Sequence, residues 1–460
     1  MYLESLTLKN LRRCRDLRMD FTRGGKPRMW TVLIGENGTG KTTILQAIAL
    51  AAAGNRQAAA LAGSCVPHLR DRRNDSRLEI DADFRFGPEG CREPKVHPRL
   101  PLGEFEALPE GLGLWSQVRL KKGSSSFSAT SSYRTPRGRL WAGEDPLDEA
   151  REDKHRHLWF VVGYGVHRVL PSAGRVPDLS NPATNRMRPL FDPDSVPAST
   201  SFINYFGGGK KARQYSAALK EVIINTGILP DDLLDLELRG KGGVSRGSDL
   251  VERDRFQQKL GEDRVKIPAV ALAHGYQSTI AWIADLVGQV LLEAKVAVEP
   301  RDYEGLVLVD EIDLYLHPTW QVRLIPALKK TFPKLQFICT THSPAILGNL
   351  APDEVVRLEL DEGGNVVHQN VGWHHDAPNP AGASRQPDPR TLTGTELYQE
   401  YFGIPGRTLS KYQDKLRSYT ALAGSPDRND YQQEKLERLG RELREEGAEL
   451  LPEPVARSSE

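Results

Sequence analysis

A glycine-rich segment near the start of the chain has the residue types and spacing of a phosphate-binding loop. It reads Gly35, Glu36, Asn37, Gly38, Thr39, Gly40, Lys41 and Thr42, and so satisfies the pattern GxxxxGK[ST]. Backbone N–H groups of such a loop can surround the β- and γ-phosphates of a nucleotide, while the lysine adds positive charge. We therefore assign the segment through Thr43 to nucleotide binding and Lys41 to catalysis. The alternative is a glycine-rich turn that binds no nucleotide.

Two adjacent carboxylates follow an apolar run much later in the chain. The run begins at Leu306 and ends directly before Asp310 and Glu311. At the end of a strand, Asp310 can hold Mg²⁺, usually through water, and the hydroxyl of Thr42 is the second expected ligand. Glu311 can orient and polarise an attacking water, which makes it the candidate catalytic carboxylate. Taken alone, the pair could be a solvated strand end, but the phosphate loop upstream favours a site for ATP and Mg²⁺.

Short apolar segments must position these residues. Trp30 to Ile34 predicts a buried strand that runs into the phosphate loop, and Thr43 to Leu50 predicts the helix that follows it. Parallel strands with polar residues at their carboxyl ends are where α/β sheets bind ligands. The sequence therefore predicts an α/β fold with a sheet around the phosphate loop. Further buried strands are expected at 158–164, 305–309 and 336–340, and a helix at 279–292.

Composition excludes several classes of protein. The 460 residues include 62 Lys and Arg against 61 Asp and Glu, so the net charge is +1 and a polybasic protein is excluded. No stretch reaches the roughly 18 apolar residues of a membrane-spanning helix. The amino terminus lacks the pattern of a secretory signal, and the 4 cysteines show no CxxC spacing. We expect a reduced cytoplasmic protein with no membrane partner.

The residues around the two carboxylates, together with a later segment, resemble a known family. Val309 to Pro318 reads VDEIDLYLHP, and Phe337 to Pro344 reads FICTTHSP. Both segments are similar to the ABC-type ATPases of the RecF, SMC and OLD group. The resemblance implies that His342 contacts the γ-phosphate as a catalytic residue. The alternative is a capping or core histidine.

Two further segments extend the resemblance. Alternating apolar residues from Leu3 to Phe21 predict an opening hairpin, which is similar to the first hairpin of the group. By that resemblance, Arg12 and Arg13 in its turn lie near the nucleotide. The Q-loop of the family falls near Tyr164 to Arg168, although no glutamine can be assigned to it.

The segment from Leu272 to Ser278 resembles the signature segment of ABC ATPases. It opens a predicted helix and, by the resemblance, faces the γ-phosphate bound by the opposite subunit. His274, Gly275 and Gln277 are the expected contacts, with the Gly275 N–H and the helix dipole acting on the phosphate. The match is imperfect, because Ala273 and His274 stand where the family usually has serine and glycine. A helix cap without a phosphate role is the alternative.

The resemblance implies an ABC-ATPase head, a mixed sheet with a phosphate-loop core, with a β-rich lobe inserted into it and a helical appendage after it. Strand candidates at 78–86 and 115–120 lie in the insert. The predicted boundaries are 1–53 for the first part of the core, 54–157 for the inserted lobe, 158–372 for the rest of the core, 373–390 for a proline-rich linker and 391–460 for the appendage.

A segment of the insert combines basic and aromatic residues. Basic side chains for phosphates and aromatic rings for stacking suit contact with single-stranded or irregular DNA or RNA. A solvated hairpin tip is the interpretation that we favour, and contact with nucleic acid stays open. The residues are Arg119, Lys121, Lys122, Arg134, Arg137 and Arg139 with Trp115, Phe127, Tyr133 and Trp141.

The head, the insert and a tail that begins near Leu392 are together similar to the ATPase subunits of Septu-type anti-phage systems. This resemblance implies an ATP-binding and ATP-hydrolysing regulatory subunit that assembles into dimers or larger rings and controls a separate HNH nuclease. No Asp-x-Asp pair follows Gly372, so a nuclease within this chain is not expected. There are two alternatives. One is a RecF-like DNA repair ATPase, and the other is a scaffold that bound ATP stabilises and that hydrolyses hardly any ATP.

Overall fold

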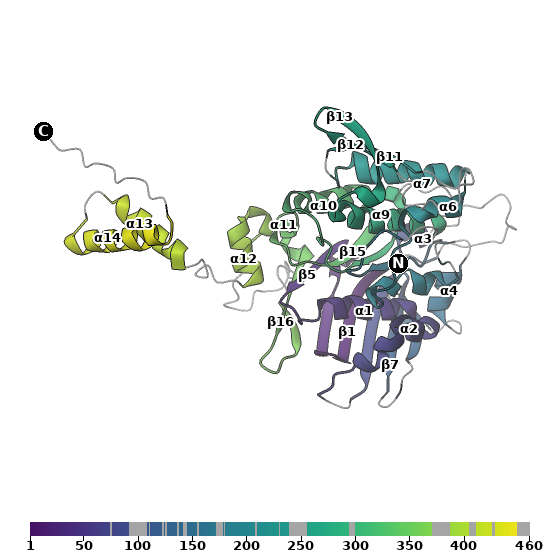
Figure 1. Ribbon diagram of the computed structural model, residues 1–460. Helices are drawn as coiled ribbons and strands as arrows, with labels where there is room; N and C mark the ends of the chain where they lie inside the picture. Colours follow the sequence, from purple (N-terminus) through teal and green to yellow (C-terminus); the bar gives the residue numbers. More distant parts are fainter. Residues whose placement is uncertain are drawn as a thin grey trace. The chain divides into compact units, whose positions relative to one another are not determined.

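The strands that carry the candidate site lie side by side in one sheet of the computed structural model (Figure 1). The order is β10-β14-β15-β5-β16-β17, and neighbours are parallel except β16 and β17. The four expected strands of the core are confirmed as β5, β10, β14 and β15. Because these strands are parallel, the residues that follow them meet at one edge of the sheet. The bounds are β5 Trp30–Gly35, β10 Val161–Tyr164, β14 Gly305–Val309, β15 Leu335–Thr340, β16 Val355–Leu360 and β17 Val366–Gln369.

The structure describes most of the chain and divides it into two compact units, Met1–Thr391 and Leu392–Glu460. The segment 54–157 lies within the first unit. The described residues are 1–73, 76–91, 108–109, 111–121, 124, 127–135, 138–140, 145–153, 156–171, 178, 180–207, 209–229, 231–238, 255–293, 300–369, 387–403, 411–425 and 428–448. Most of the expected linker at 373–390 is outside these residues.

A second sheet, antiparallel throughout, has the order β2-β1-β6-β7-β8-β9. The opening hairpin is confirmed as β1 and β2. The strands of the insert do not form a sheet of their own, because β6 pairs with β1 over seven residue pairs and so extends the hairpin. The bounds are β1 Tyr2–Leu11, β2 Cys14–Asp20, β6 Leu78–Arg85, β7 Gly113–Leu120, β8 Ser128–Thr135 and β9 Gly138–Leu140.

Helix α1 (Lys41–Ala53) packs against strands of both sheets and forms the centre of the core. It is apolar on all sides and almost wholly buried, which is typical of a helix enclosed by other layers. Its last carbonyl groups accept hydrogen bonds from side chains: Ser116 Oγ donates to Ala51 O (2.7 Å) and Trp159 Nε1 donates to Ala52 O (3.0 Å). Ser116 of the insert and Trp159, which follows it, therefore satisfy the end of the helix that starts at the phosphate loop.

Helices and a small sheet occupy the rest of the first unit. The helix expected at 279–292 begins earlier, at His274, because the signature-like segment forms its first turn. The bounds are α2 Asn55–Ala62, α3 Pro88–Cys91, α4 Pro146–Glu152, α5 Pro182–Asn185, α6 Phe202–Phe206, α7 Lys210–Lys220, α9 His274–Glu293, α10 Pro318–Thr331, α11 Pro344–Leu347, β3 Thr22–Arg23, β4 Lys26–Pro27, β11 Leu233–Glu237, β12 Arg255–Leu260 and β13 Asp263–Pro268.

The second unit contains α12 (Gly394–Phe402), α13 (Lys411–Ala423) and α14 (Asp430–Glu445), so the helical appendage has the expected secondary structure. Tyr419, Leu436, Leu439 and Leu443 form its small core. These residues recur at three and four positions along their helices, which places them on one face.

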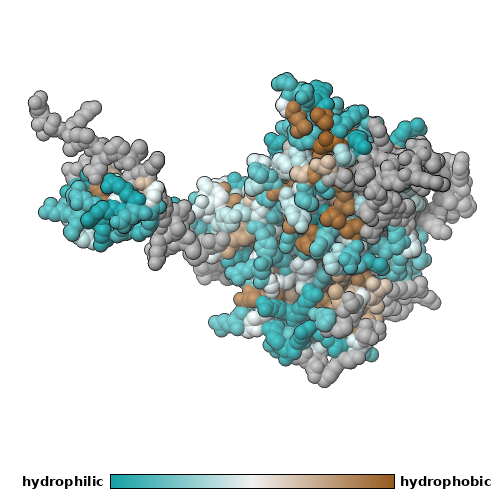
Figure 2. All heavy atoms as spheres, viewed as in Figure 1, coloured by the Kyte–Doolittle hydropathy of each residue, from teal (hydrophilic) through white to brown (hydrophobic). Residues whose placement is uncertain are grey.

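The visible surface is mostly hydrophilic (Figure 2). Hydrophobic atoms are exposed over β12 and β13, where Leu260 and Val265 are 52% and 38% exposed. Within the described part of the chain, every helix is too short or too polar to cross a membrane.

One buried side chain joins the two sheets. Gln336 on β15 is 0% exposed, and its Oε1 accepts a hydrogen bond from Leu3 N on β1 (2.7 Å). Its Nε2 donates to Leu3 O (3.0 Å) and to Arg28 O (2.9 Å). The amide thus satisfies main-chain groups that the sheets themselves leave unpaired.

Replacing this amide with a hydrocarbon should weaken the junction. We expect Gln336→Leu to lower the free energy of unfolding by about 3 kcal/mol, because buried main-chain groups lose their partners. Urea denaturation of the purified chain measures the change. Gln214→Leu, on half-buried α7, is the matched control and should change stability by less than about 0.5 kcal/mol. Equal effects in the two variants would contradict the role given to Gln336.

Candidate functional site

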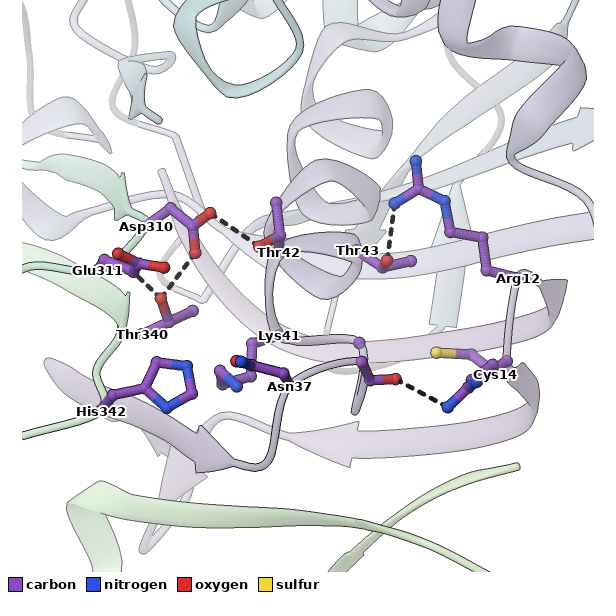
Figure 3. Close-up of a pocket in the computed structure, with 13 residues that line it drawn as sticks. Arg12, Cys14, Asn37, Lys41, Thr42, Thr43, Asp310, Glu311, Thr340 and His342 are labelled. Carbon is purple, nitrogen blue, oxygen red and sulfur yellow. Dashed lines mark hydrogen bonds between the residues drawn. The ribbon is translucent and has the colours of Figure 1, made fainter. Parts of the chain in front are cut away.

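The loops that follow β5, β14 and β15 surround a pocket of about 380 Å³ next to the turn of the opening hairpin (Figure 3). The structure thus brings together residues that are up to 330 positions apart in the sequence: Arg12 and His342 line the same space. The lining residues are Arg12, Arg13, Cys14, Asn37, Gly38, Gly40, Lys41, Thr42, Thr43, Asp310, Glu311, Thr340 and His342.

Glycines shape the phosphate loop for two reasons. Gly38 and Gly40 have φ of 83° and 84°, a left-handed conformation that favours glycine. A Cβ on Gly35 would lie 2.4 Å from the carbonyl oxygen of Leu358 on β16, so this position has no room for a side chain. Gly35, Glu36 and Thr39 belong to the loop but do not line the pocket. Thr39 Oγ1 instead donates to Glu36 O (2.8 Å) and tightens the turn.

Lys41 lies across this loop. Its Nζ donates hydrogen bonds to Gly35 O (2.8 Å) and Glu36 O (2.9 Å). Burial lowers the pKa of the ammonium group, while Asp310 and Glu311 oppose the shift. Both acceptors are neutral carbonyl oxygens, so its positive charge can act on an anion that enters the pocket.

Asp310 is held by two hydroxyl groups. Thr42 Oγ1 donates to its Oδ2 (2.7 Å) and Thr340 Oγ1 donates to its Oδ1 (2.7 Å) (Figure 3). Mg²⁺ prefers oxygen ligands such as carboxylates, hydroxyls and waters, so the Thr42 and Asp310 side chains have the chemistry that fits this ion. Thr340 was missed in the sequence analysis, although it precedes His342 in the FICTTHSP segment.

Glu311 has an unusual backbone conformation. Its φ is 47°, in the left-handed region that residues with a side chain rarely adopt. Its N–H donates to Thr340 Oγ1 (2.7 Å), and its carbonyl oxygen accepts from Arg168 Nη2 (2.6 Å). Arg168, expected near the Q-loop, does not line the pocket and contacts the main chain behind it.

His342 follows β15 and points into the pocket near Lys41 and Asn37 (Figure 3). Burial lowers the pKa of its ring from the ordinary value, and the charge of Lys41 lowers it further. The imidazole is therefore neutral at pH 7, with one nitrogen as donor and one as acceptor. A neutral ring can donate one hydrogen bond to a phosphate oxygen without carrying a charge.

The turn of the opening hairpin forms another wall of the pocket. Arg12 has φ of 47°, and its Nη1 donates to Thr43 Oγ1 (2.9 Å) and Gln46 Oε1 (3.2 Å) on α1. Arg13 lies beside the phosphate loop. Cys14, which sequence reasoning missed, also lines the pocket, but burial raises the pKa of its thiol to about 12, so it is not a thiolate at neutral pH.

The signature-like residues are not part of this pocket. A Cβ on Gly275 would lie 2.5 Å from the carbonyl oxygen of Tyr315, so α9 starts against the loop after β14. His274 is exposed, with its ring 6.5 Å from that of Tyr315. Gln277 Nε2 donates to Leu272 O (2.6 Å). Within one protomer these residues cap and pack the helix, and their contact with a nucleotide across subunits stays a prediction.

The basic residues of the insert are partly engaged by acidic neighbours. Arg119 forms an ion pair with Glu79 on β6 (3.3 Å), and Arg134 forms one with Asp83 (3.2 Å). Tyr133 donates a hydrogen bond to a carboxylate on α4. Lys122, Arg137 and Trp141 lie outside the described residues, as does the side chain of Arg139. The strand pairing thus supplies negative charges that the segment itself lacks.

The strain at Glu311 can be measured with two substitutions that both remove the carboxylate. We expect Glu311→Gly to be more stable than Glu311→Ala by about 1 kcal/mol, because only glycine adopts the left-handed conformation without a steric cost. Chemical denaturation of both variants gives the difference. The same two substitutions at Gln214 on α7 should reverse the order, because alanine favours a helix. A more stable alanine variant at position 311 would contradict the assigned backbone conformation.

Two segments of the chain match known families of AAA domains. Residues 1–109 match the family described as "AAA ATPase domain". Residues 225–348 match the family described as "AAA domain, putative AbiEii toxin, Type IV TA system". The first match contains the phosphate loop and the second contains Asp310, Glu311 and His342.

Individual proteins show the same relationship. The Septu protein PtuA of Bacillus mycoides (strain KBAB4) is 26% identical over 444 residues, which cover 95% of this chain and 50% of that protein. The Retron Ec83 probable ATPase of Escherichia coli is 45% identical over 87 residues, 19% of this chain and 16% of that protein. The chain thus spans half or less of the length of these relatives. A solved structure, the SmcHead bound to the C-winged helix domain of ScpA, has a TM-score of 0.46 at 18% identity and covers 81% of this chain and 98% of that one. The resemblance recognised in the sequence is confirmed: the chain is similar to Septu PtuA over most of its own length, and two of its segments match AAA ATPase families.

Proposed function

We propose that the chain binds ATP with Mg²⁺ and hydrolyses it. The observation that carries this proposal is the meeting of the phosphate loop, the Thr42–Asp310 pair and Glu311 around one pocket. Lys41 and the loop N–H groups bind the β- and γ-phosphates, and Thr42 and Asp310 hold the metal. Mg²⁺, when bound, neutralises part of the negative charge on the phosphates.

The proposed hydrolysis uses the residues that face the γ-phosphate. Water attacks the γ-phosphorus, the bond from that phosphorus to the β–γ bridging oxygen breaks, and Glu311 accepts a proton from the water. His342, neutral at pH 7 because of its lowered pKa, donates a hydrogen bond to a γ-phosphate oxygen. The hydrogen bond from the Glu311 N–H to Thr340 Oγ1 holds the main chain of Glu311, which keeps its carboxylate at the edge of the pocket.

A second copy of the chain completes the site in this proposal. In each protomer, α9 begins at His274, which is exposed, as is Ala273 directly before it. The Gly275 N–H and the positive end of the α9 dipole would face the γ-phosphate held by the opposite protomer. Because Ala273 has no hydroxyl, this contact depends on main-chain groups more than in the family pattern.

The biological role that we propose is regulation of a bacterial anti-phage defence complex. The similarity to Septu protein PtuA over 95% of this chain supports it, as does the similarity to a retron ATPase. In this proposal the chain is a cytoplasmic subunit whose nucleotide state controls a separate nuclease of the HNH type. DNA or RNA contacts the assembly through the nuclease or through the insert.

Neutralising the candidate carboxylate tests hydrolysis and dimerisation together. We expect Glu311→Gln to keep nucleotide affinity and to lower ATP turnover by about 10²–10⁴-fold, because general base catalysis is lost. With ATP and Mg²⁺, light scattering should show dimers that accumulate in this variant. Glu362→Gln, in an exposed turn, is the control and should turn over ATP like the wild type. Normal turnover in Glu311→Gln would overturn the assignment of Glu311.

Co-purification tests the defence role. We expect the tagged chain to co-purify with a nuclease encoded by a neighbouring gene, and DNA cleavage by that complex to change when ATP is removed. Lys41→Ala is the control, because without the ammonium group the complex should respond to ATP no longer. A chain that purifies alone, and whose ATP turnover rises on gapped DNA, would contradict the regulatory role and favour a repair ATPase.

A further inference from the structure

Arg168 lies behind the two catalytic carboxylates. It follows β10 and is 1% exposed. Its Nη1 donates to Gly165 O (2.9 Å) and Asp310 O (2.5 Å), and its Nη2 donates to Glu311 O (2.6 Å). These hydrogen bonds all end on main-chain carbonyl oxygens. The guanidinium group therefore acts on the path of the backbone, while the carboxylates of Asp310 and Glu311 line the pocket on the other side.

Both peptide groups that flank the Cα of Glu311 are fixed by side chains. The N–H before it is bound by Thr340, and the carbonyl after it is bound by Arg168. Leu314 N also donates to the same carbonyl (2.9 Å). With φ at 47°, the residue is in a conformation that costs free energy and that persists only where its surroundings impose it. Arg168 and Thr340 are the groups that impose it here.

The planar fork of arginine suits this arrangement. A guanidinium group presents parallel N–H donors, so it can hold two consecutive carbonyl groups at once, whereas an ammonium group is a single point of charge. Burial lowers the pKa of Arg168 to about 10, and the charges of Asp310, Asp313 and Glu311 oppose the shift. The group stays protonated at neutral pH, so all of its donors are available.

The far side of Arg168 is anchored as well. Asp310 N donates to Tyr164 O (2.8 Å), which joins the end of β14 to the end of β10, four residues before the arginine. The Tyr164 hydroxyl donates to Asp285 Oδ2 on α9 (2.9 Å). The end of β10, from which Arg168 follows, is therefore fixed to β14 and α9. Such support is needed if the guanidinium group is to hold a strained loop in place.

We propose that Arg168 is the positioning residue for ATP hydrolysis, which holds Glu311 in its left-handed conformation and so places the carboxylate that activates water. The proposal rests on the hydrolysis proposed above. It predicts that Arg168 acts through Glu311 and not through nucleotide binding, because Arg168 does not line the pocket and contacts Asp310 and Glu311 through their main-chain carbonyl groups. Loss of the fork should let the loop relax and move the carboxylate by a fraction of an ångström or more.

A double-mutant cycle on ATP turnover tests this. We expect Arg168→Lys to lower kcat by about 10–100-fold, because small displacements of a catalytic group have effects of this size, and to change nucleotide affinity by less than about 3-fold. In the Glu311→Gln background, the same change should lower kcat by less than about 2-fold, because the group that Arg168 positions is already inactive. The proposal would be overturned if Arg168→Lys lowered kcat by the same factor in the wild-type and Glu311→Gln backgrounds. It would also be overturned if Arg168→Lys weakened nucleotide binding.

A comparison of stability tests the same inference without activity. The difference in melting temperature between Glu311→Gly and Glu311→Ala should shrink by at least half, as a rough expectation, in the Arg168→Lys background, because residue 311 is then free to leave the left-handed region. An unchanged difference would overturn the proposal. If the wild-type chain hydrolyses no ATP, the proposed function fails, and this comparison still decides whether Arg168 holds residue 311.

Arg186 supplies the matched control, because it is a second buried arginine in the same unit. Its Nε donates to Gln289 Oε1 (2.9 Å) and its Nη2 forms an ion pair with Glu293, so this side chain bonds to α9 and not to the main chain of Asp310 and Glu311. Arg186→Lys should leave kcat unchanged. It should also leave unchanged the difference in melting temperature between Glu311→Gly and Glu311→Ala, even if it lowers both melting temperatures. If a buried ammonium group prevents folding of Arg168→Lys, Arg168→Gln takes its place in both cycles. Loss of folding in both variants would overturn the proposal, because the guanidinium group would then hold the fold and not one loop.

Discussion

The hydrogen bond between Thr42 and Asp310 joins two residues that are 268 positions apart, and the rest of the site depends on it. It fixes the first turn of α1 against the end of β14, and so sets the distance between the phosphate loop and the carboxylates. Thr340 ends β15, the strand between β5 and β14, and its hydroxyl reaches the other oxygen of Asp310. A buried carboxylate without such donors would be costly. The sheet order therefore places two hydroxyl groups where one carboxylate needs them.

Local patterns were sufficient to predict the parts of this arrangement. The glycine spacing from Gly35 to Gly40, the apolar run before Asp310 and the segment before His342 each depend on a few consecutive residues, and the structure brings all of them to one pocket. The order of the strands was not predictable in this way, because β5 pairs with strands that lie some 300 residues later. For the same reason the sequence did not show that β6 would extend the opening hairpin.

Arg168 illustrates a different limit of sequence reasoning. Its partners are main-chain carbonyl groups, which every residue has, so no pattern of side chains signals the contact. Cys14 lines the pocket only because the hairpin turn folds against the phosphate loop. Strained residues also collect here: Arg12, Glu311 and Tyr315 have positive φ, and all three lie in loops around the site. Such strain is stored where the surrounding structure can impose it, which again depends on tertiary contacts.

The end of β10 links the carboxylates to the helix that begins with the signature-like segment. Asp285 on α9 is fully enclosed, and burial raises the pKa of its carboxyl group. Its Oδ2 accepts from Tyr164, and its Oδ1 accepts from Ala198 N (2.8 Å). Tyr164 in turn accepts from Asp310 N. Ten residues of helix, about 15 Å at 1.5 Å per residue, separate Gly275 from Asp285. In the proposed dimer, a phosphate of the opposite protomer would contact the first turn of α9. The same helix is linked through Asp285 and Tyr164 to Asp310, at the end of the strand that precedes Glu311. Within one protomer, Asp285, Tyr164 and Asp310 thus link α9 to the strand end that carries Glu311.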